Sequence, residues 1–379
     1  RSRFRAHLLP AMVYVRQERL PALKQYKYSS VDHSLVSKYI LKPFYTNVVI
    51  KLFPLSMAPN LITLTGFMFV VANFLTLLWY NPTLDQDCPS WVYYSWAAGL
   101  FLYQTFDAVD GTQARRTKQS GPLGELFDHG VDALNTSLEV LIFAASQNMG
   151  QSWKTVATLF ASLLTFYVQT WDEYHTKTLT LGIVNGPVEG ILILVGVYAL
   201  TGYKGGASFW QQGMLAAVGI PQEILGLTIP EGVYNMNFTE WYMVQGTVVL
   251  VCNTVESARN VIRARRAKGD KSRYALVGLG PFFAAWGLIV AYLWCSRGVL
   301  RCQHSPIPGL GWPSALGDGV YQVAYMFCML GMAVGVYGSF VVDVIVTICD
   351  YLDIWCLTIK HPYVPEEEDE SNGELKKKN

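Results

Sequence analysis

Long apolar stretches with almost no charge recur along the whole chain. They cover residues 61–80, 91–106, 155–171, 190–200, 241–255, 274–295 and 320–342. Most are long enough to cross a bilayer as a helix, which takes about 20 residues. An eighth stretch, 133–148, is interrupted by Glu139 but supplies a needed return crossing. We therefore predict an all-α polytopic membrane protein with about eight transmembrane helices and an N-terminal interfacial amphipathic helix.

The amino-acid composition also indicates a membrane protein. Hydrophobic residues make up 51% of the chain and charged residues only 15%, too apolar a mixture to be buried in a water-soluble domain of 379 residues. The net charge of +1 gives no steering field for nucleic acid, so no nucleic-acid partner is expected. Seven cysteines show no paired spacing, which argues against a disulfide framework.

Positive charges in short loops predict the orientation, because they collect on the cytoplasmic side. One basic loop carries Arg115, Arg116 and Lys118, and the other spans 259–273. Both are expected in the cytosol, together with both chain ends. The loop around Asp85 and the stretch 202–240, which holds the glycosylation sequon at Asn237, are expected in the lumen.

The two ends of the chain differ from its middle. No apolar signal-peptide core opens the chain at Arg1, so internal helices are expected to direct insertion. The tail closes with Lys376 to Asn379, a dilysine pattern that resembles an endoplasmic-reticulum retrieval signal; the membrane of that organelle, or the Golgi, is the expected location. We expect four regions: a cytosolic arm and interfacial helix (1–57), catalytic helices (58–206), a C-terminal membrane region (207–357) and a cytosolic tail (358–379). Within the third, 340–357 is interpreted as amphipathic rather than spanning.

Four aspartates stand where the second apolar stretch ends. Asp107 and Asp110 are three residues apart, and Asp128 and Asp132 are four apart, so on helices each pair shares one face. The pairs can then converge on one pocket, where cations would relieve their mutual repulsion. An all-oxygen environment suits hard divalent ions, so we predict a site for Mg²⁺ or Mn²⁺.

Small and basic residues accompany the aspartates. Gly111 and Ala114 leave room for a phosphate or ribose near the backbone, and Gly124 allows close helix packing. Arg115 offers a permanent charge and a bidentate fork for phosphate oxygens. The expected substrate therefore bears phosphate.

The complete spacing is more specific than any of its parts. It runs Asp107, two residues, Asp110-Gly111, two residues, Ala114-Arg115, eight residues, Gly124, three residues, Asp128, three residues and Asp132. This string resembles the CDP-alcohol phosphotransferase signature at every position. The segments MAPNLIT, QTFDAVDG, TWDEYHT, GPVEG and YLDIWCLTIKHP further resemble the choline/ethanolamine phosphotransferases of the fungal branch, a family that usually has ten spans.

The resemblance implies a reaction and a role for each residue. Two metal ions held by the four aspartates would bind the pyrophosphate of CDP-choline or CDP-ethanolamine. A diacylglycerol hydroxyl would attack the phosphorus that bears the amino-alcohol, and CMP would leave. The implied substrate-binding residues are Asn60, Gly111, Ala114, Arg115, Lys118 and Gly124. A homodimer is implied as well.

A base must take the proton of the acceptor hydroxyl. Asp132 is the usual family assignment, but a carboxylate bound to metal is a weak base, whereas the imidazole of His129 titrates nearer to neutral pH. Glu189, an intramembrane carboxylate, is a functional candidate by default. We predict that His129 is the base and that Glu189 assists it, with Asp132 kept as the alternative.

Three further points stay open. A different alcohol pair, as in inositol-type enzymes, or a cation-coupled transporter would also explain carboxylates in spanning helices. Aromatic faces suit choline, and Tyr103, Trp171 and Tyr174 are candidates for that contact. The remaining histidines lack metal-ligand spacing and are interpreted as exposed polar residues: His7, His33, His175, His304 and His361.

Overall fold

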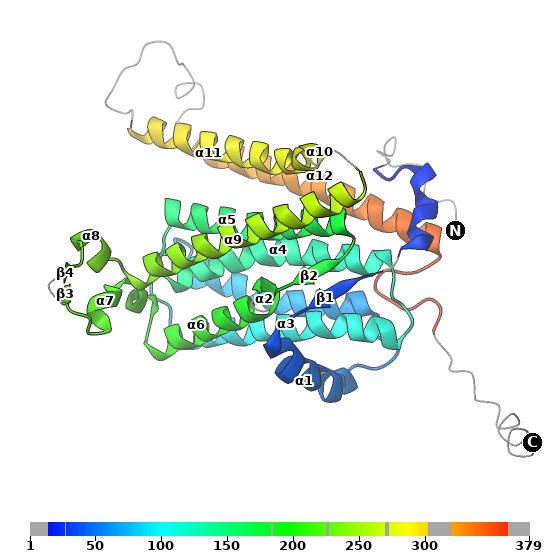
Figure 1. Cartoon of the computed structure of the whole chain (residues 1–379), viewed down its shortest axis with the longest axis horizontal. Helices are drawn as coiled ribbons and strands as arrows, with labels where there is room; N and C mark the ends of the chain where they lie inside the picture. The colour runs from blue at the N-terminus through cyan, green and yellow to red at the C-terminus, as the bar shows by residue number, and fades with distance from the viewer. Residues whose placement is uncertain are drawn as a thin grey trace, which may run out of the picture.

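The computed structural model is an all-helical bundle with very little strand (Figure 1). It describes residues 14–26, 28–182, 185–224, 227–269, 273–301 and 320–362. The dilysine tail, the acidic residues before it, His7, His304 and Lys271 lie outside these ranges. The long helices of the described part are α2 (Pro59–Tyr80), α3 (Ser90–Arg116), α4 (Pro122–Ser146), α5 (Trp153–Thr176), α6 (Ile191–Tyr203), α9 (Phe238–Ala267), α11 (Gly280–Arg301) and α12 (Val320–Leu352).

Shorter elements connect them. The helical ones are η2 (Gln17–Gln25), η3 (Ser37–Leu41), α1 (Lys42–Asn47), η4 (Val49–Leu52), η5 (Gly186–Gly190), η6 (Ala207–Gln211), α7 (Met214–Ala217), α8 (Glu231–Tyr234), α10 (Arg273–Leu276) and η7 (Val277–Leu279). Strand β1 (Ser30–Asp32) pairs in parallel with β2 (Leu179–Leu181), and β3 (Glu223–Ile224) pairs antiparallel with β4 (Leu227–Thr228).

The main core lies between α2, α3, α4 and α6. Its largest fully buried side chains include Tyr93, Trp96 and Tyr198. Glycines let α2 and α3 approach closely, because a Cβ on Gly66 would meet Phe106 at 2.8 Å and one on Gly99 would meet Asn73 at 2.4 Å. This close contact fixes α2 against α3, the helix that carries Asp107 and Asp110.

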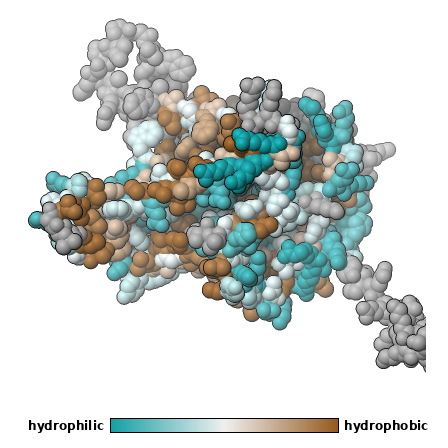
Figure 2. All heavy atoms as spheres, viewed as in Figure 1, coloured by the Kyte–Doolittle hydropathy of each residue, from teal (hydrophilic) through white to brown (hydrophobic). Residues whose placement is uncertain are grey.

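Five of the eight apolar stretches lie within one long helix, and the other three (133–148, 190–200 and 274–295) are helical over nearly all of their length, which confirms the all-helical membrane class. Four segments of the described chain are long and apolar enough to cross a bilayer: Pro59–Tyr80, Gly186–Tyr203, Tyr274–Ala291 and Leu330–Leu352. The protein is therefore a multi-pass membrane protein. In the view of Figure 2, hydrophobic atoms stand out on the left and in the upper middle of the molecule, and hydrophilic atoms form a patch near the centre and lie along the right.

The interpretation of 340–357 as a separate amphipathic helix is wrong. α12 runs without a break to Leu352, and its last 23 residues form one of the four candidate spans. Asp343 lies inside this span and has a polar partner, because its carboxylate accepts a hydrogen bond from the backbone N–H of Tyr14 (3.1 Å). A helix with mostly apolar surface tolerates a carboxylate that has found a partner near its end.

Loops that were expected on the same side do meet at the same end of the bundle. Asp87, between α2 and α3, accepts hydrogen bonds from the backbone N–H of Ser208 (2.9 Å) and the amide of Asn148 (3.1 Å). At the other end, Lys268 after α9 reaches the carbonyl of His175 at the end of α5 (3.3 Å). In Figure 1 the C-terminal ends of α3 and α9, which carry basic residues in their last turns, both lie on the right of the bundle.

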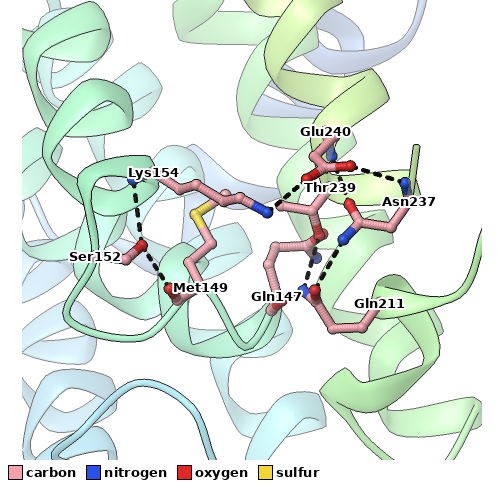
Figure 3. A network of polar contacts seen from close by, with 8 residues as sticks. All are labelled: Gln147, Met149, Ser152, Lys154, Gln211, Asn237, Thr239 and Glu240. Carbon is pink, nitrogen blue, oxygen red and sulfur yellow. Dashed lines mark hydrogen bonds and ion pairs between the residues drawn. The ribbon is translucent and has the colours of Figure 1, made fainter. Parts of the chain in front are cut away.

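A network of polar contacts fastens the end that carries Asp87 (Figure 3). Lys154 Nζ lies 2.8 Å from Glu240, whose backbone N–H donates to the side chain of Asn237 (2.8 Å). The amide of Asn237 donates to Gln211 (2.9 Å), and Gln211 donates to the carbonyl of Gln147. The sequon asparagine is thus the N-cap of α9 rather than part of a free loop.

The N-terminal arm contains the expected short amphipathic helical region, from Ser37 to Leu52. Tyr45, Val49 and Ile50 are buried against the start of the bundle, and the other side of the arm exposes Tyr39, Ile40, Phe44, Val48 and Leu52. Arg116 at the end of α3 donates to the carbonyls of Ile50 and Phe53 (both 3.1 Å), which anchors the arm. Its contact with a membrane surface stays a prediction.

Candidate active site

The carboxylates of three aspartates meet where α3 and α4 lie side by side. Asp107 and Asp110 are one turn apart near the end of α3, and Asp128 lies two turns into α4. One oxygen from each falls within 4.8 Å of the others. The helical spacing seen in the sequence therefore brings these three side chains together.

The fourth aspartate lies beside this triad and is held by hydrogen bonding. Asp132 accepts a hydrogen bond from the hydroxyl of the fully buried Tyr103 on α3, and Asp110 accepts one from the hydroxyl of Thr63 on α2. Both contacts are short. They aim the carboxylates into the gap between α2, α3 and α4, so three helices shape the site.

The triad is electrostatically unfavourable without a cation. Burial, and then repulsion among the aspartates, raises the pKa of Asp107 and Asp110 well above the usual range. One oxygen of Asp107 and one of Asp128 are buried with no hydrogen-bond partner. Orphaned acceptors of this kind fit a hard divalent cation, which accepts carboxylate oxygens as ligands.

The predicted substrate-binding residues surround the triad at varied depth. A Cβ on Gly111 would touch only the guanidinium of Arg115, at 3.6 Å, and one on Gly124 would come to 3.8 Å from Asn60, so both positions keep the space open. Asn60 is only 8% exposed. Arg115 is exposed and reaches back to Thr112 (3.1 Å).

Ala114 lies one residue before Arg115 on α3, and Lys118 follows the end of this helix with a positive φ of 58°. Lys118 is exposed, as is Arg115. The two basic side chains thus lie exposed at the end of α3 and just after it.

His129 lies on α4 next to Asp128, and both of its ring nitrogens have partners. Nδ1 is 3.0 Å from the carbonyl of Glu125, and Nε2 is 3.3 Å from the carboxylate of Glu173 on α5. Burial alone would lower the pKa of His129, but the hydrogen bond to Glu173 and the nearby charge of Asp128 outweigh it and raise the pKa to about 9. A bound cation would offset the aspartate charges and bring this pKa down.

The expected pairing of Glu189 with His129 is wrong, since the carboxylate beside His129 belongs to Glu173. Glu189 instead accepts hydrogen bonds from the hydroxyl of Ser34 and from the backbone N–H of Asn185 (3.0 Å). Gln104 of α3 holds the same turn by donating to the carbonyl of Pro187 (3.1 Å). Glu189 therefore fastens the N-terminal arm to the turn before α6.

Two of the three aromatic candidates for choline contact are engaged elsewhere. Tyr103 is bonded to Asp132, and the indole of Trp171 donates to the carbonyl of Ala275 (3.0 Å). Tyr174 is exposed and lies under the ammonium of Lys177 (4.6 Å). His175, expected to be exposed, is 7% exposed between Trp171 and Tyr174, because it closes the last turn of α5.

Three residues of the site were not assigned a role from the sequence: Thr63, Tyr103 as a partner of Asp132, and Glu173. Thr63 lies one turn after Asn60, so the helical spacing alone could have placed it on the same face. Glu173 could be found only through the packing of α4 against α5, because no local spacing links it to His129.

The structure thus defines a multi-pass membrane protein with a candidate divalent-cation site formed by three aspartates. A family model for CDP-alcohol phosphatidyltransferases matches residues 56–222, which contain the whole site. The chain belongs to this family, whose members are phospholipid-synthesising transferases.

Several relatives match along almost their full length. A CDP-alcohol phosphatidyltransferase class-I family protein of Schizosaccharomyces pombe is 41% identical, over 92% of this chain and 98% of its own. Choline/ethanolaminephosphotransferase 1 of Saccharomyces cerevisiae is 36% identical over the same shares of each chain. Choline/ethanolaminephosphotransferase 1 of Arabidopsis thaliana is 48% identical over 53% of this chain and 51% of its own.

Proposed function

We propose that the protein transfers phosphocholine and/or phosphoethanolamine from CDP-choline or CDP-ethanolamine to the hydroxyl of diacylglycerol, releasing CMP. The products are phosphatidylcholine and phosphatidylethanolamine. The observation that carries this proposal is the half-buried cluster of Asp107, Asp110 and Asp128 in a chain that matches yeast choline/ethanolaminephosphotransferase 1 over 92% of its length. Phosphoryl transfer depends on alignment and charge neutralisation, which such a cluster provides once loaded.

The cofactor in this proposal is a pair of Mg²⁺ or Mn²⁺ ions. Asp107, Asp110 and Asp128 would hold one or both, and Asp132, one turn along α4, would join them. The ions would neutralise the pyrophosphate of the donor and the charge that develops on the leaving CMP. Arg115 and Lys118 would bind phosphate oxygens at the outer edge, with Asn60, Gly111, Ala114 and Gly124 around the nucleotide.

A side chain of the protein must then accept the proton of the attacking diacylglycerol hydroxyl. We assign the base to His129, with Glu173 in place of Glu189 as the partner that orients the ring and accepts the charge. Nε2 would first have to give its own proton to Glu173, while Nδ1–H stays bonded to the carbonyl of Glu125; the free Nε2 could then take the hydroxyl proton of diacylglycerol. Asp132 remains the alternative, although its bond to Tyr103 lowers its ability to accept a proton.

The same proposal covers location. The membrane would be that of the endoplasmic reticulum or the Golgi, with the site on the cytosolic side, because the basic ends of α3 and α9 lie at the aspartate end. The four regions 1–57, 58–206, 207–357 and 358–379 would serve as arm, catalytic helices, C-terminal membrane region and tail. Assembly as a homodimer completes the proposal and is checked by mass photometry in nanodiscs.

One assay tests the proposed reaction against its rivals. Purified protein in lipid nanodiscs receives Mg²⁺ and either labelled CDP-choline or CDP-ethanolamine with diacylglycerol, or CDP-diacylglycerol with labelled inositol. Labelled phospholipid that forms only with diacylglycerol as the acceptor supports the proposal. Labelled phospholipid formed from CDP-diacylglycerol and inositol would identify the other alcohol pair. Cation flux into proteoliposomes without any CMP release would indicate a transporter.

A further inference from the structure

The segment that follows α12 folds back against the aspartate end of the bundle. It starts at Asp353, whose positive φ of 56° turns the chain. The carboxylate of Asp353 pairs with Lys360 and lies 3.0 Å from Nε2 of His361, which closes residues 353–361 into a compact loop. In Figure 1 this loop follows the orange end of α12. We call it the C-terminal loop.

Two hydrogen bonds connect the C-terminal loop to the signature helices. The amide of Asn60, at the start of α2, donates to Sγ of Cys356 (3.7 Å). The amide of Gln119, between α3 and α4, donates to the carbonyl of His361 (3.3 Å). Apolar contacts add to them, since Leu123 of α4 is buried in one cluster with Val344 and Ile348 of α12 and with Cys356. The C-terminal loop therefore contacts the start of α2, the connection between α3 and α4, and the first turn of α4.

Asn60 is the contact that matters for substrate. It lies one turn before Thr63, the partner of Asp110, and its carbonyl oxygen faces the open space at Gly124. A side-chain amide can bind two partners at once, because its oxygen accepts hydrogen bonds and its NH₂ group donates them. With the NH₂ group bonded to Cys356, the oxygen is left to point toward Gly124 and the substrate space.

We propose that the C-terminal loop forms the outer wall of the CDP-alcohol site and that Cys356 is a positioning residue which fixes the orientation of the Asn60 amide. The proposal rests on the function proposed above, because it assumes that the nucleotide occupies the space beside Asn60 and Gly124. Residues about 300 positions after Asn60 then contribute to nucleotide affinity without touching the metal ligands.

Kinetics of three variants test the positioning role. Cys356→Ala removes the acceptor, so the KM for CDP-choline should rise about fivefold, with kcat and the KM for diacylglycerol within twofold of the unaltered protein. Cys356→Ser keeps an acceptor and should restore the KM. Cys349→Ala, one turn before the end of α12 and without a contact to Asn60, is the matched control and should change neither constant. An unchanged KM in Cys356→Ala overturns the proposal, as does an equal rise in Cys349→Ala.

Alkylation gives a readout that does not depend on activity. Rates of N-ethylmaleimide labelling are followed site by site by mass spectrometry, with Mg²⁺ and with or without CMP. CMP should slow labelling of Cys356 at least fivefold and leave Cys349 within twofold. Equal rates at Cys356 with and without CMP, in a protein that binds CMP by calorimetry and transfers phosphocholine, overturn the proposal. Absence of both CMP binding and transfer in the unaltered protein would instead refute the proposed function.

Discussion

The imidazole of His129 lies 3.3 Å from the carboxylate of Glu173, a residue on another helix and 44 positions along the chain. The second ring nitrogen is held by the carbonyl of Glu125, so the ring has one defined orientation. Both ring nitrogens thus face oxygen acceptors, and the hydrogen bond to Glu173 helps to raise the pKa of His129 to about 9.

The first prediction follows from this pair. His129→Ala should lower kcat about 10²-fold or more, and Glu173→Gln about tenfold, while the KM for CDP-choline stays nearly constant. Steady-state kinetics in nanodiscs provide the measurement. Near-normal turnover in His129→Ala, with the loss confined to Asp132→Asn in a protein that still binds metal, would return the base to Asp132.

The second prediction concerns the metal triad. Asp107→Ala, Asp110→Ala and Asp128→Ala should each reduce transfer below about a tenth of the normal rate, because each removes a metal ligand. None should unfold the protein, since the change also relieves repulsion among buried carboxylates. Asp343→Ala on α12 is a control outside the site. Thermal unfolding and Mg²⁺ titration of transfer separate the two effects, and high activity in any triad variant contradicts the assignment.

The third prediction is a pH dependence of the metal-free protein. The pKa of His129 is raised from 6.5 to about 9, so its contribution to stability is complete below pH 6.5 and is lost as the pH rises through 9. The raised pKa values of Asp107 and Asp110 act in the same direction. The Tm in EDTA should therefore fall as the pH rises from 5.5 to 9, by an amount that fluorescence-detected unfolding can measure.

Its controls use metal and a variant. Mg²⁺ should raise the Tm most at the high end of this pH range, where the carboxylates are ionised. His129→Ala should flatten the curve between about pH 6.5 and 9. A Tm in EDTA that rises with pH across the whole range would contradict the electrostatic account.

The fourth prediction separates Glu189 from the chemistry. Glu189→Gln weakens the bonds to Ser34 and Asn185, so the N-terminal arm should loosen at a cost of about 1–3 kcal/mol. Hydrogen exchange of residues 30–37 should speed up, while the pH profile of kcat keeps its shape. Ser34→Ala should reproduce the effect. A shifted pH profile in Glu189→Gln alone would assign Glu189 a catalytic role.

The fifth prediction concerns topology at Asn237. A cysteine placed at 237 should resist membrane-impermeant maleimide in intact microsomes and react after permeabilisation, because this end lies opposite the aspartates. A cysteine at 115 should react in both conditions. Glycan should be scarce, since the side-chain amide of Asn237 is bonded to Gln211 and Thr239 is fully buried. Labelling of position 237 in intact microsomes would place this end in the cytosol and contradict the predicted orientation.

The sequence predicted what helical spacing determines. The turn-by-turn placement of Asp107, Asp110 and Asp128 needs only the period of a helix, and the structure brings them together. The choice of Glu173 over Glu189 depends on how α4 packs on α5, which no spacing records. The run of α12 through Asp343 was missed because a charged residue was taken as the end of a span, whereas a partner from the N-terminal arm satisfies it.

The parallel pairing of β1 with β2 joins Ser30 to Leu179, and the C-terminal loop joins Asn60 to Cys356. During synthesis the arm leaves the ribosome long before the strand that receives it, and the loop arrives only with the last part of the chain. The catalytic helices can insert and pack early, but the walls around them close last. A nascent or truncated chain would therefore hold its aspartates in place and still lack a finished substrate chamber, so that maturation of activity, rather than of helical structure, waits for the end of translation.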